Sequence, residues 1–493
     1  MDFKRSSTRN KQPTSQLMDG EAIKTLFEQC SDVVFSTLQF GNHEVTLVYC
    51  VGLISNDMLY KTVPLRLDEF FRNPLEEMIN NSIHLLQLPS LQVIENNEKA
   101  EKEVFSGKLL LIFNKSDIVY SVDISDRPQR NPEETSIEVS VKGPRDNFIE
   151  DIVVNQALIR KRLRTTSLIC EPFEVGKRTK TKVSLLFMKD IADPTIITQI
   201  RTKIMHMDLD GLHSGTQLGE LINDNPYSIF PRHTYTGRPD FAVQSLLNGR
   251  FVVLIDGVSY AYLAPVNLFF LLKSSEDMEA NYLYGGFERL IRVVGISVAV
   301  FLPAFWVALT TFHQNQIPFS LLATVIESRK GVPLPSSLEA ILMLLLFEVF
   351  REAGLRLPIA VGQTLSVIGG LIIGDAAIRA GLTSPAMLVV IAGSTIATFT
   401  LVNQTLAGIV SLFRILIILL VSILGFFGFF VSVFILGTMV ARVNSFGVPY
   451  LQIALNFSLK NILKAIIKLP EQKDTKRPSS INPIDPTKKG GKS

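Results

Sequence analysis

The sequence predicts two structural classes in one chain: a soluble α/β region made of two small subdomains, followed by an all-α polytopic transmembrane domain. The first observation is the distribution of charge. Charged residues occur throughout residues 1–285, whereas none lies between Arg414 and Arg442. The second is the length of the apolar runs, because a bilayer span needs about 20 residues and a fully apolar helix of a soluble core rarely exceeds about 10–14. We therefore expect a membrane domain at residues 286–443.

The composition of the whole chain limits the classes of function. Its 493 residues allow two or three domains, and its formal net charge of +3 gives no reason to expect a nucleic-acid partner. The three cysteines, Cys30, Cys50 and Cys170, lack the spacing of a metal site, so we expect buried reduced thiols. Residues 1–24 are basic and expected to be disordered, and residues 1–16 lack the apolar stretch of a signal peptide.

The soluble region contains two segments in which predicted strands and helices alternate. Apolar, β-branched runs at 33–40 and 45–54 are separated by the turn-forming pair Gly41-Asn42, which predicts a hairpin. Further predicted elements are strands at 109–113, 118–122 and 181–187 and helices at 73–86, 148–163 and 194–205. The predicted subdomains are residues 25–130 and 131–285.

Residues 230–240 predict a rigid connector, because Pro231 and Pro239 fix φ and bias the preceding residues toward extended geometry. We expect Asp240 to cap a helix that begins near Phe241. The alternative is a loop that contacts a partner subunit. Its candidate contact residues would be Phe230, Arg238 and Asp240.

Four apolar stretches of the membrane domain are long enough to cross a bilayer. Ser384 and Pro385 provide a cap and a first-turn proline for the third. The last stretch exceeds a single upright span, so it is either a long tilted helix or a broken pair, with Gly425 and Gly428 at the weak point. The predicted spans are residues 290–312, 358–380, 385–406 and 411–441.

A fifth apolar segment, residues 336–355, differs from these spans. Glu339 lies in its first turn, where a carboxylate favours the dipole of its own helix. Glu348, Arg351 and Glu352 fall on one face at i, i+3 and i+4. The segment is too charged to face lipid, so we interpret it as an interfacial or re-entrant helix, or as one that lines an aqueous path.

Several polar residues of the membrane domain have no reason to face lipid and are candidates for a pore lining. They are Glu348, Glu352, Gln363, Asp375, Asn403 and Gln404. The alternative for each is pairing inside the helix bundle. Such pairs would join Glu348 or Glu352 to Arg351, and Asp375 to Arg379.

Basic residues at both ends of the membrane domain predict its orientation. Arg289 and Arg292 precede the first span and Arg442 follows the last, so both termini should be cytoplasmic. Four full crossings satisfy this requirement, whereas five would place the basic tail outside. Residues 444–469 predict an amphipathic basic helix that either lies on the inner leaflet or packs against the soluble region. Residues 470–493 predict a disordered tail.

No catalytic, cofactor-binding or metal-binding constellation is expected. Asp208 and Asp210 lie in an acidic turn typical of solvated loops, and the histidines lack partners at ligand spacing. Residues 490–493 imitate the end of a phosphate-binding loop, but they lack the preceding strand and the following helix that such a loop requires. We therefore do not expect an enzyme.

A series of short motifs carries a family resemblance over residues 30–465. In chain order they are Gly143-Pro-Arg-Asp-Asn-Phe-Ile-Glu-Asp, Asp210-Gly-Leu-His-Ser-Gly, Ser228-Ile-Phe-Pro-Arg, Thr236-Gly-Arg-Pro-Asp, Ser275-Glu-Asp, Pro333-Leu-Pro, Phe350-Arg-Glu-Ala-Gly-Leu-Arg-Leu-Pro and Thr383-Ser-Pro. In these motifs the chain resembles the A subunits of bacterial spore germinant receptors, the GerA type. Gly237 departs from the family, which usually carries an acidic residue at this position.

The resemblance implies a multi-pass protein of the spore inner membrane that acts in spore germination. It implies a receptor of three parts, with a transporter-like B subunit that holds the nutrient and a lipoprotein C subunit. It also implies a homo-oligomer, surrounded by membrane lipid, that forms or gates an ion-conducting path. The alternative function is a secondary transporter with a cytoplasmic regulatory domain. The lack of a detectable internal repeat in the spans argues against that alternative.

Overall fold

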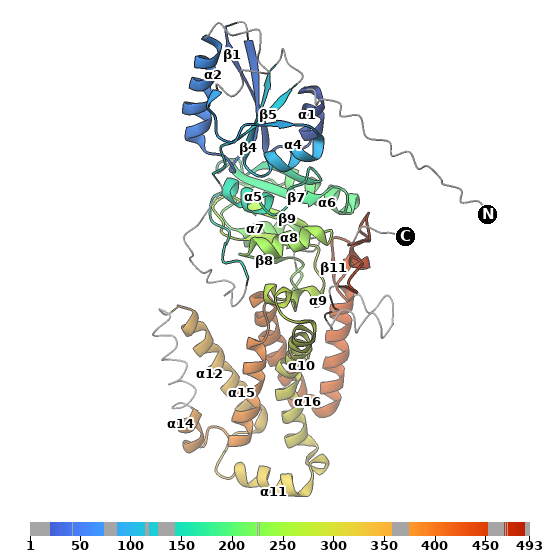
Figure 1. The fold of residues 1–493 in the computed structure, drawn as a ribbon. Helices are drawn as coiled ribbons and strands as arrows, with labels where there is room; N and C mark the ends of the chain where they lie inside the picture. The colour runs from blue at the N-terminus through green and yellow to red at the C-terminus, as the bar shows by residue number, and fades with distance from the viewer. Residues whose placement is uncertain are drawn as a thin grey trace, which may run out of the picture. The chain divides into compact units, whose positions relative to one another are not determined.

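The computed structural model describes residues 20–41, 43–72, 86–113, 118–126, 143–223, 225, 227–356, 374–451, 468, 470 and 472–488. They divide into two compact units (Figure 1). The soluble unit comprises the described residues of Met1–Ile222, Tyr235–Leu263 and Arg477–Pro486, and the helical unit those of Asn223–Thr234, Ala264–Lys476 and Thr487–Ser493. Most of the predicted helix 73–86, most of the predicted span 358–380 with Gln363, and residues 452–467 lie outside the described residues.

The first half of the soluble unit is a five-stranded sheet with the strand order β1-β2-β4-β5-β3. β1 (Val33–Phe40) and β2 (His43–Cys50) form the predicted hairpin, in which Phe40 pairs with His43 next to the turn. The other strands are β3 (Gln92–Ile94), β4 (Lys108–Phe113) and β5 (Val119–Asp123). Every pair of neighbouring strands in this sheet is antiparallel.

Both faces of this sheet are covered, because alternate side chains of a strand point to opposite sides. Val48 and Leu110 lie in one apolar core with residues of α1 (Gly20–Phe27) and α4 (Asn97–Val104). Leu47 and Leu111 lie in a second core with residues of α2 (Val63–Arg72). Since Ile23 of α1 is fully buried, the predicted disorder of residues 1–24 is wrong for residues 20–24.

The second half of the soluble unit is a five-stranded sheet with the order β6-β7-β9-β10-β8. Its strands are β6 (Leu168–Val175), β7 (Thr181–Met188), β8 (Thr234–Thr236), β9 (Phe251–Ile255) and β10 (Ala261–Ala264), and its helices are α5 (Ile152–Arg160), α6 (Pro194–Met205), α7 (Gly215–Ile222) and α8 (Pro239–Leu247). Asp151 and Asp193 cap α5 and α6 by accepting hydrogen bonds from backbone N–H groups of their first turns. The prediction of two α/β subdomains is confirmed.

The two halves of the soluble unit have the same strand order, 1-2-4-5-3, when each is numbered from its own first strand. In each half one helix precedes the first hairpin and another precedes the fourth strand. A glycine followed by a basic residue stands at the start of the fourth strand in both halves. The pair is Gly107-Lys108 in one half and Gly249-Arg250 in the other. Both glycines have positive φ, 88° and 91°. The soluble unit is therefore built from two modules of one topology.

The helices of the helical unit run from the short α9 to the long, broken α16. In chain order its helices are α9 (Leu268–Leu271), α10 (Tyr282–Phe312), α11 (Phe319–Ser328), α12 (Ser336–Arg356), α14 (Gly374–Arg379), α15 (Pro385–Phe399) and α16 (Gln404–Arg442). Among the described residues, α10 and α16 are long and apolar enough to cross a membrane. The predicted cap at Ser384 is confirmed, since its side chain accepts a hydrogen bond from the N–H of Met387. The predicted span 385–406 is too long, because α15 ends at Phe399.

α16 breaks at Gly425, whose φ of 58° and ψ of −139° are not helical. Before this break the chain runs parallel to α10. Thr400, just before α16, lies against Gly295 near the middle of α10, and Gly425 lies against Phe312 at the end of α10. Glycine is required here, because this combination of φ and ψ is essentially restricted to glycine.

After the break, α16 runs back along α10. Phe426 packs on His313 just beyond the end of α10, with ring centroids 4.7 Å apart, and Phe429 packs on Phe301 at 6.0 Å. Arg442 therefore lies at the end of the bundle where α10 begins. The single span predicted over 411–441 is wrong, and the broken pair at Gly425 is confirmed.

Replacing Gly425 by alanine should destabilise the helical unit by about 2 kcal/mol or more, because strained backbone of this kind costs about 1–3 kcal/mol. An added Cβ would also lie 3.0 Å from the ring of Phe312. Thermal unfolding of the purified chain in detergent, followed by circular dichroism, measures the effect. Gly437→Ala is the control, since its added Cβ meets nothing within 4 Å. Equal midpoints for the two variants would contradict the strained turn.

The described residues after α16 adopt structures that the sequence did not predict. Residues 444–449 form a small hairpin of β11 (Asn444–Ser445) and β12 (Val448–Pro449), so the predicted helix 444–469 does not begin at its expected boundary. In the soluble unit, Ile481 is buried and the N–H of Ile484 donates to the carbonyl of Ile191. The predicted disorder of 470–493 is therefore wrong for residues 472–488, because this segment buries an apolar side chain and pairs its backbone.

Candidate functional site

An ion-pair cluster lies among the apolar helices α12, α15 and α16. Glu348 of α12 accepts from Arg414 of α16, with Oε1 3.0 Å from Nη2. Its other oxygen, Oε2, lies 2.7 Å from Nη2 of Arg351. Arg414 is 1% exposed. A charge buried in this way stays ionised only when it is paired and hydrogen-bonded, so one carboxylate compensates two arginines here.

Two serine hydroxyls complete this cluster. Nη1 of Arg414 donates to Ser394 of α15 at 3.3 Å, and Nη1 of Arg351 donates to Ser411 of α16 at 3.1 Å. Glu348 and its neighbours thus connect three helices through charged hydrogen bonds, which are stronger than neutral ones. The i, i+3 spacing predicted the pair Glu348–Arg351. No local signal in the sequence pointed to Arg414, which stands alone in an apolar run.

The other lining candidates among the described residues are engaged locally or exposed. Asp375 pairs with Arg379 at 2.7 Å on the exposed side of α14. Asn403 caps α16 through Leu406 N–H, and its amide donates to Thr234 at 3.0 Å. Glu348–Arg351 and Asp375–Arg379 are two of the pairs that the predicted alternative named, but Asp375–Arg379 is exposed rather than inside the bundle. Two more candidates, Glu352 and Gln404, are exposed.

Glu339, at the start of α12, is fully buried. Its Oε1 accepts hydrogen bonds from the backbone N–H and the hydroxyl of Ser384, both at 2.6 Å, and from the hydroxyl of Thr383 at 3.1 Å. The sequence predicted that this carboxylate serves the dipole of its own helix. Glu339 lies in the first turn of α12, as predicted, and it also holds the N-terminus of α15, which lies 45 residues further along the chain.

Asp277 anchors the beginning of α10. Its carboxylate accepts from Nε of Arg289 at 3.0 Å and from Nη1 of Arg292 at 2.8 Å, and its side chain is 2% exposed. Ser274 and Asp277 form a capping box around the short helix Ser275–Met278. The Ser-Glu-Asp motif thus holds the two arginines from which the sequence predicted the orientation of the first span.

The connector 230–240 is held within its own chain. Phe230 is buried and stacks on Phe413, with ring centroids 5.6 Å apart and planes 13° apart. Arg238 is also buried and binds both carboxylate oxygens of Asp240. Two of the three predicted contact residues, Phe230 and Arg238, are therefore covered by side chains of this chain. The predicted cap is wrong: α8 starts at Pro239, so Asp240 already lies in its first turn.

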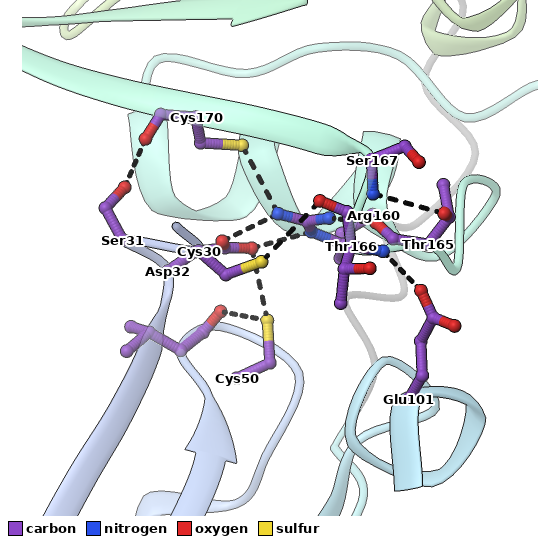
Figure 2. A network of polar contacts seen from close by, with 11 residues as sticks. Cys30, Ser31, Asp32, Cys50, Glu101, Arg160, Thr165, Thr166, Ser167 and Cys170 are labelled. Carbon is purple, nitrogen blue, oxygen red and sulfur yellow. Dashed lines mark hydrogen bonds and ion pairs between the residues drawn. The ribbon is translucent and has the colours of Figure 1, made fainter. Parts of the chain in front are cut away.

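A buried ion pair joins the two modules of the soluble unit (Figure 2). Asp32, just before β1, accepts from Nε and Nη2 of Arg160 at the end of α5, both at 2.7 Å. Their side chains are 4% and 1% exposed. Two further hydrogen bonds cross the same joint, from the Ser31 hydroxyl to the carbonyl of Cys170 and from the backbone N–H of Thr166 to Glu101.

The three cysteines meet at this joint, which the sequence did not predict. Cys50 donates to Asp32 at 3.5 Å, and Nη2 of Arg160 donates to Cys170 at 3.6 Å. Burial raises the pKa of Cys30 to about 11 and raises the pKa values of Cys50 and Cys170 as well. All three are free and buried, as predicted. Thiols with raised pKa values stay protonated at neutral pH and are poor nucleophiles.

Comparison with known proteins gives the family. The sequence model of the family described as "Bacillus/Clostridium GerA spore germination protein" matches residues 21–480. The chain belongs to the GerA family. The resemblance carried by the sequence motifs is therefore confirmed.

Relatives within the GerA family match nearly the whole chain. "Spore germination protein XA" of Bacillus anthracis is 40% identical over 94% of this chain and 96% of its own length. "Spore germination protein KA" of Bacillus subtilis (strain 168) is 30% identical over 93% of this chain and 85% of its own length. The chain is also similar to a crystal structure, that of the N-terminal domain of the A subunit of the Bacillus megaterium spore germinant receptor GerK3. The match covers 51% of this chain and 95% of the chain in that structure. Its identity is 24% and its TM-score is 0.37, too low for an inference about the fold.

Proposed function

We propose that this chain is the A subunit of a nutrient germinant receptor in the spore inner membrane and that it acts in spore germination. The family match over residues 21–480 and the names of its full-length relatives support this proposal. The subunit acts with a transporter-like B subunit and a lipoprotein C subunit, and it assembles as a homo-oligomer. The motifs that carry the family resemblance are distributed over both the soluble and the helical unit.

The proposed topology is multi-pass, with both termini cytoplasmic. It is supported by the antiparallel course of α10 and the second half of α16, which brings the basic ends of both helices to one side of the bundle. Arg289, Arg292 and Arg442 are then cytoplasmic, as basic flanks generally are.

Lys488 near the C-terminus provides a test of this topology. An impermeant amine-reactive reagent added outside native-oriented vesicles should leave Lys488 unlabelled until the membrane is permeabilised. Labelling of Lys488 in sealed vesicles would overturn the proposed orientation.

The proposed mechanism is that the cluster of Glu348, Arg351 and Arg414 holds α12 against α15 and α16 in the resting receptor and so keeps an ion path closed. The observation that carries the proposal is the buried Arg414, paired with a carboxylate on another helix inside an apolar bundle. Opening the path would require these charged hydrogen bonds to rearrange. A pair of this kind has two discrete states, bound and broken, as a gate requires.

Glu348→Gln should cause ion release from spores without nutrient. The amide can accept from only one of the two arginines, and a hydrogen bond to a charged group contributes about 1.5–3 kcal/mol. Basal ion release should therefore rise about tenfold or more. The control is Glu327→Gln on α11, which removes an exposed ion pair with Lys330. Immunoblots establish equal amounts of protein, and equal basal release in both variants would refute the gate.

A further inference from the structure

α11 is a short apolar helix that lies across the end of the helical unit at which α10 ends (Figure 1). Its 10 residues rise about 15 Å, which is half the thickness of the hydrocarbon core of a bilayer. Val325 is its buried residue, whereas Phe319 is 87% exposed and Ile326 is 54% exposed. An exposed apolar surface of this kind marks a contact with a membrane or with another protein.

The apolar and polar side chains of α11 lie on different faces. Apolar residues recur at i, i+3, i+4 and i+7 and form one face, which we call the apolar face of α11. They are Phe319, Leu322, Ala323 and Ile326. The neighbouring face is polar and exposed, and its residues are Ser320, Thr324 and Glu327. Separate apolar and polar faces are typical of a helix that lies in the plane of the interface between lipid and water.

The helix α10, which is long and apolar enough to cross a membrane, sets the depth of α11. Arg292 of α10 binds Asp277, and the helix rises about 30 Å between Arg292 and Phe312. This rise equals the thickness of the hydrocarbon core, so Phe312 lies at one membrane surface when Arg292 lies at the other. Because a short polar segment with Gln314–Gln316 connects Phe312 to Phe319, α11 begins at that surface.

The turn of α16 at Gly425 supports the same depth. Gly425 lies against Phe312. On either side of the turn, Ile423 is 77% exposed and Phe427 is 68% exposed. Such large exposed apolar side chains indicate that the hydrocarbon core extends to the end of α10. The apolar face of α11 is therefore next to lipid.

We propose that α11 lies flat in the membrane surface and inserts its apolar face among the acyl chains of the surrounding phospholipids. Its polar face is turned to water. Arg329, directly after α11, donates to the carbonyl of Leu334 at 3.2 Å and to the hydroxyl of Ser336 at the start of α12. The lipid contact of α11 thereby fixes the depth at which α12 enters the membrane. This contact does not depend on the proposed function, whereas its place on the extracytoplasmic side rests on the proposed topology.

Tryptophan fluorescence of the purified full-length chain in phosphatidylglycerol vesicles tests the proposal. The chain has a single tryptophan, Trp306, which lies in α10 about 9 Å deeper than Phe312. In a Trp306→Phe background, Phe319→Trp reports on the apolar face and Ser320→Trp is the matched control on the polar face. Lipids brominated near the headgroup end of their acyl chains should quench most of the fluorescence of Phe319→Trp. They should quench little of the fluorescence of Ser320→Trp, which acrylamide in the water should quench instead.

The unaltered chain provides the depth reference, because lipids brominated near the methyl end should quench Trp306 more strongly than they quench Phe319→Trp. Equal quenching of Phe319→Trp and Ser320→Trp by acrylamide would mean that α11 projects into water and would overturn the proposal. Fluorescence of Phe319→Trp that neither quencher reduces would also overturn it, since protein would then cover the apolar face. Ile326→Trp repeats the measurement on the same face if Phe319→Trp does not fold. Bromine quenching is independent of the labelling of Lys488, so the lipid contact and the proposed topology can fail separately.

Discussion

Replacing Asp32 by asparagine should lower the free energy of unfolding of the soluble unit by about 3–5 kcal/mol, because it leaves a buried arginine without its counter-charge. Arg160 is 1% exposed and binds both oxygens of Asp32. An asparagine can accept from only one of these two donors, and its own NH2 group would face the other. The other hydrogen bonds of Arg160, to the carbonyl of Thr165 at 2.8 Å and to Cys170 at 3.6 Å, do not neutralise the charge.

The thiols at the joint provide the readout. Because Cys50 and Cys170 contact the ion pair and are buried, a maleimide reagent labels them only when the joint opens. Asp32→Asn should therefore increase the labelling rate at least a hundredfold at neutral pH, since each 1.4 kcal/mol corresponds to a factor of ten.

The control for this variant is Glu171→Gln. Glu171 and Arg201 also form a two-point pair, but their side chains are 25% and 34% exposed. Removing such a pair costs about 1 kcal/mol or less. Replacing both Asp32 and Arg160 by apolar residues of similar volume should restore most of the stability lost in Asp32→Asn. Equal loss in Glu171→Gln and Asp32→Asn would contradict the role of burial.

The sequence was sufficient to predict the two α/β subdomains, because the evidence for strands and turns is local. Apolar alternation and the Gly41-Asn42 turn predicted the first hairpin, which the structure contains. The joint between the modules could not be predicted in this way, since Asp32 and Arg160 are 128 residues apart and each is unremarkable in its own segment. The shared strand order was also missed, because the two modules share a pattern rather than a sequence.

In the helical unit, composition predicted the apolar helices but not their course. The run between Arg414 and Arg442 is continuous in hydropathy, so the sequence left a long tilted helix and a broken pair open. The conformation of Gly425 and the packing of Phe426 and Phe429 on α10 show that the chain turns back. The same limit applies to the cluster at Glu348. Spacing predicted its local partner Arg351, whereas Arg414 is 66 residues away and could only be found in three dimensions.

Glu339→Ala should destabilise the helical unit by about 3 kcal/mol or more. Glu339 is fully buried and its Oε1 is the acceptor for two hydroxyls and one backbone N–H at the start of α15. Alanine would leave the backbone N–H and the hydroxyl of Ser384 unpaired in a buried site, at about 1–3 kcal/mol each. The expected result is a lower midpoint of thermal unfolding in detergent.

Glu339→Gln separates hydrogen bonding from charge. The amide oxygen of glutamine can take the place of Oε1 and keep all three donors satisfied. Its NH2 group would replace Oε2, which has no hydrogen-bond partner among the described residues and lies 3.9 Å from the partly exposed Arg329. Because that ion pair is long and partly solvated, its loss should cost about 1 kcal/mol or less. Glu339→Gln should therefore unfold within a few degrees of the unaltered chain. If it is as unstable as Glu339→Ala, the negative charge of Glu339, rather than its acceptor oxygen, holds α12 to α15.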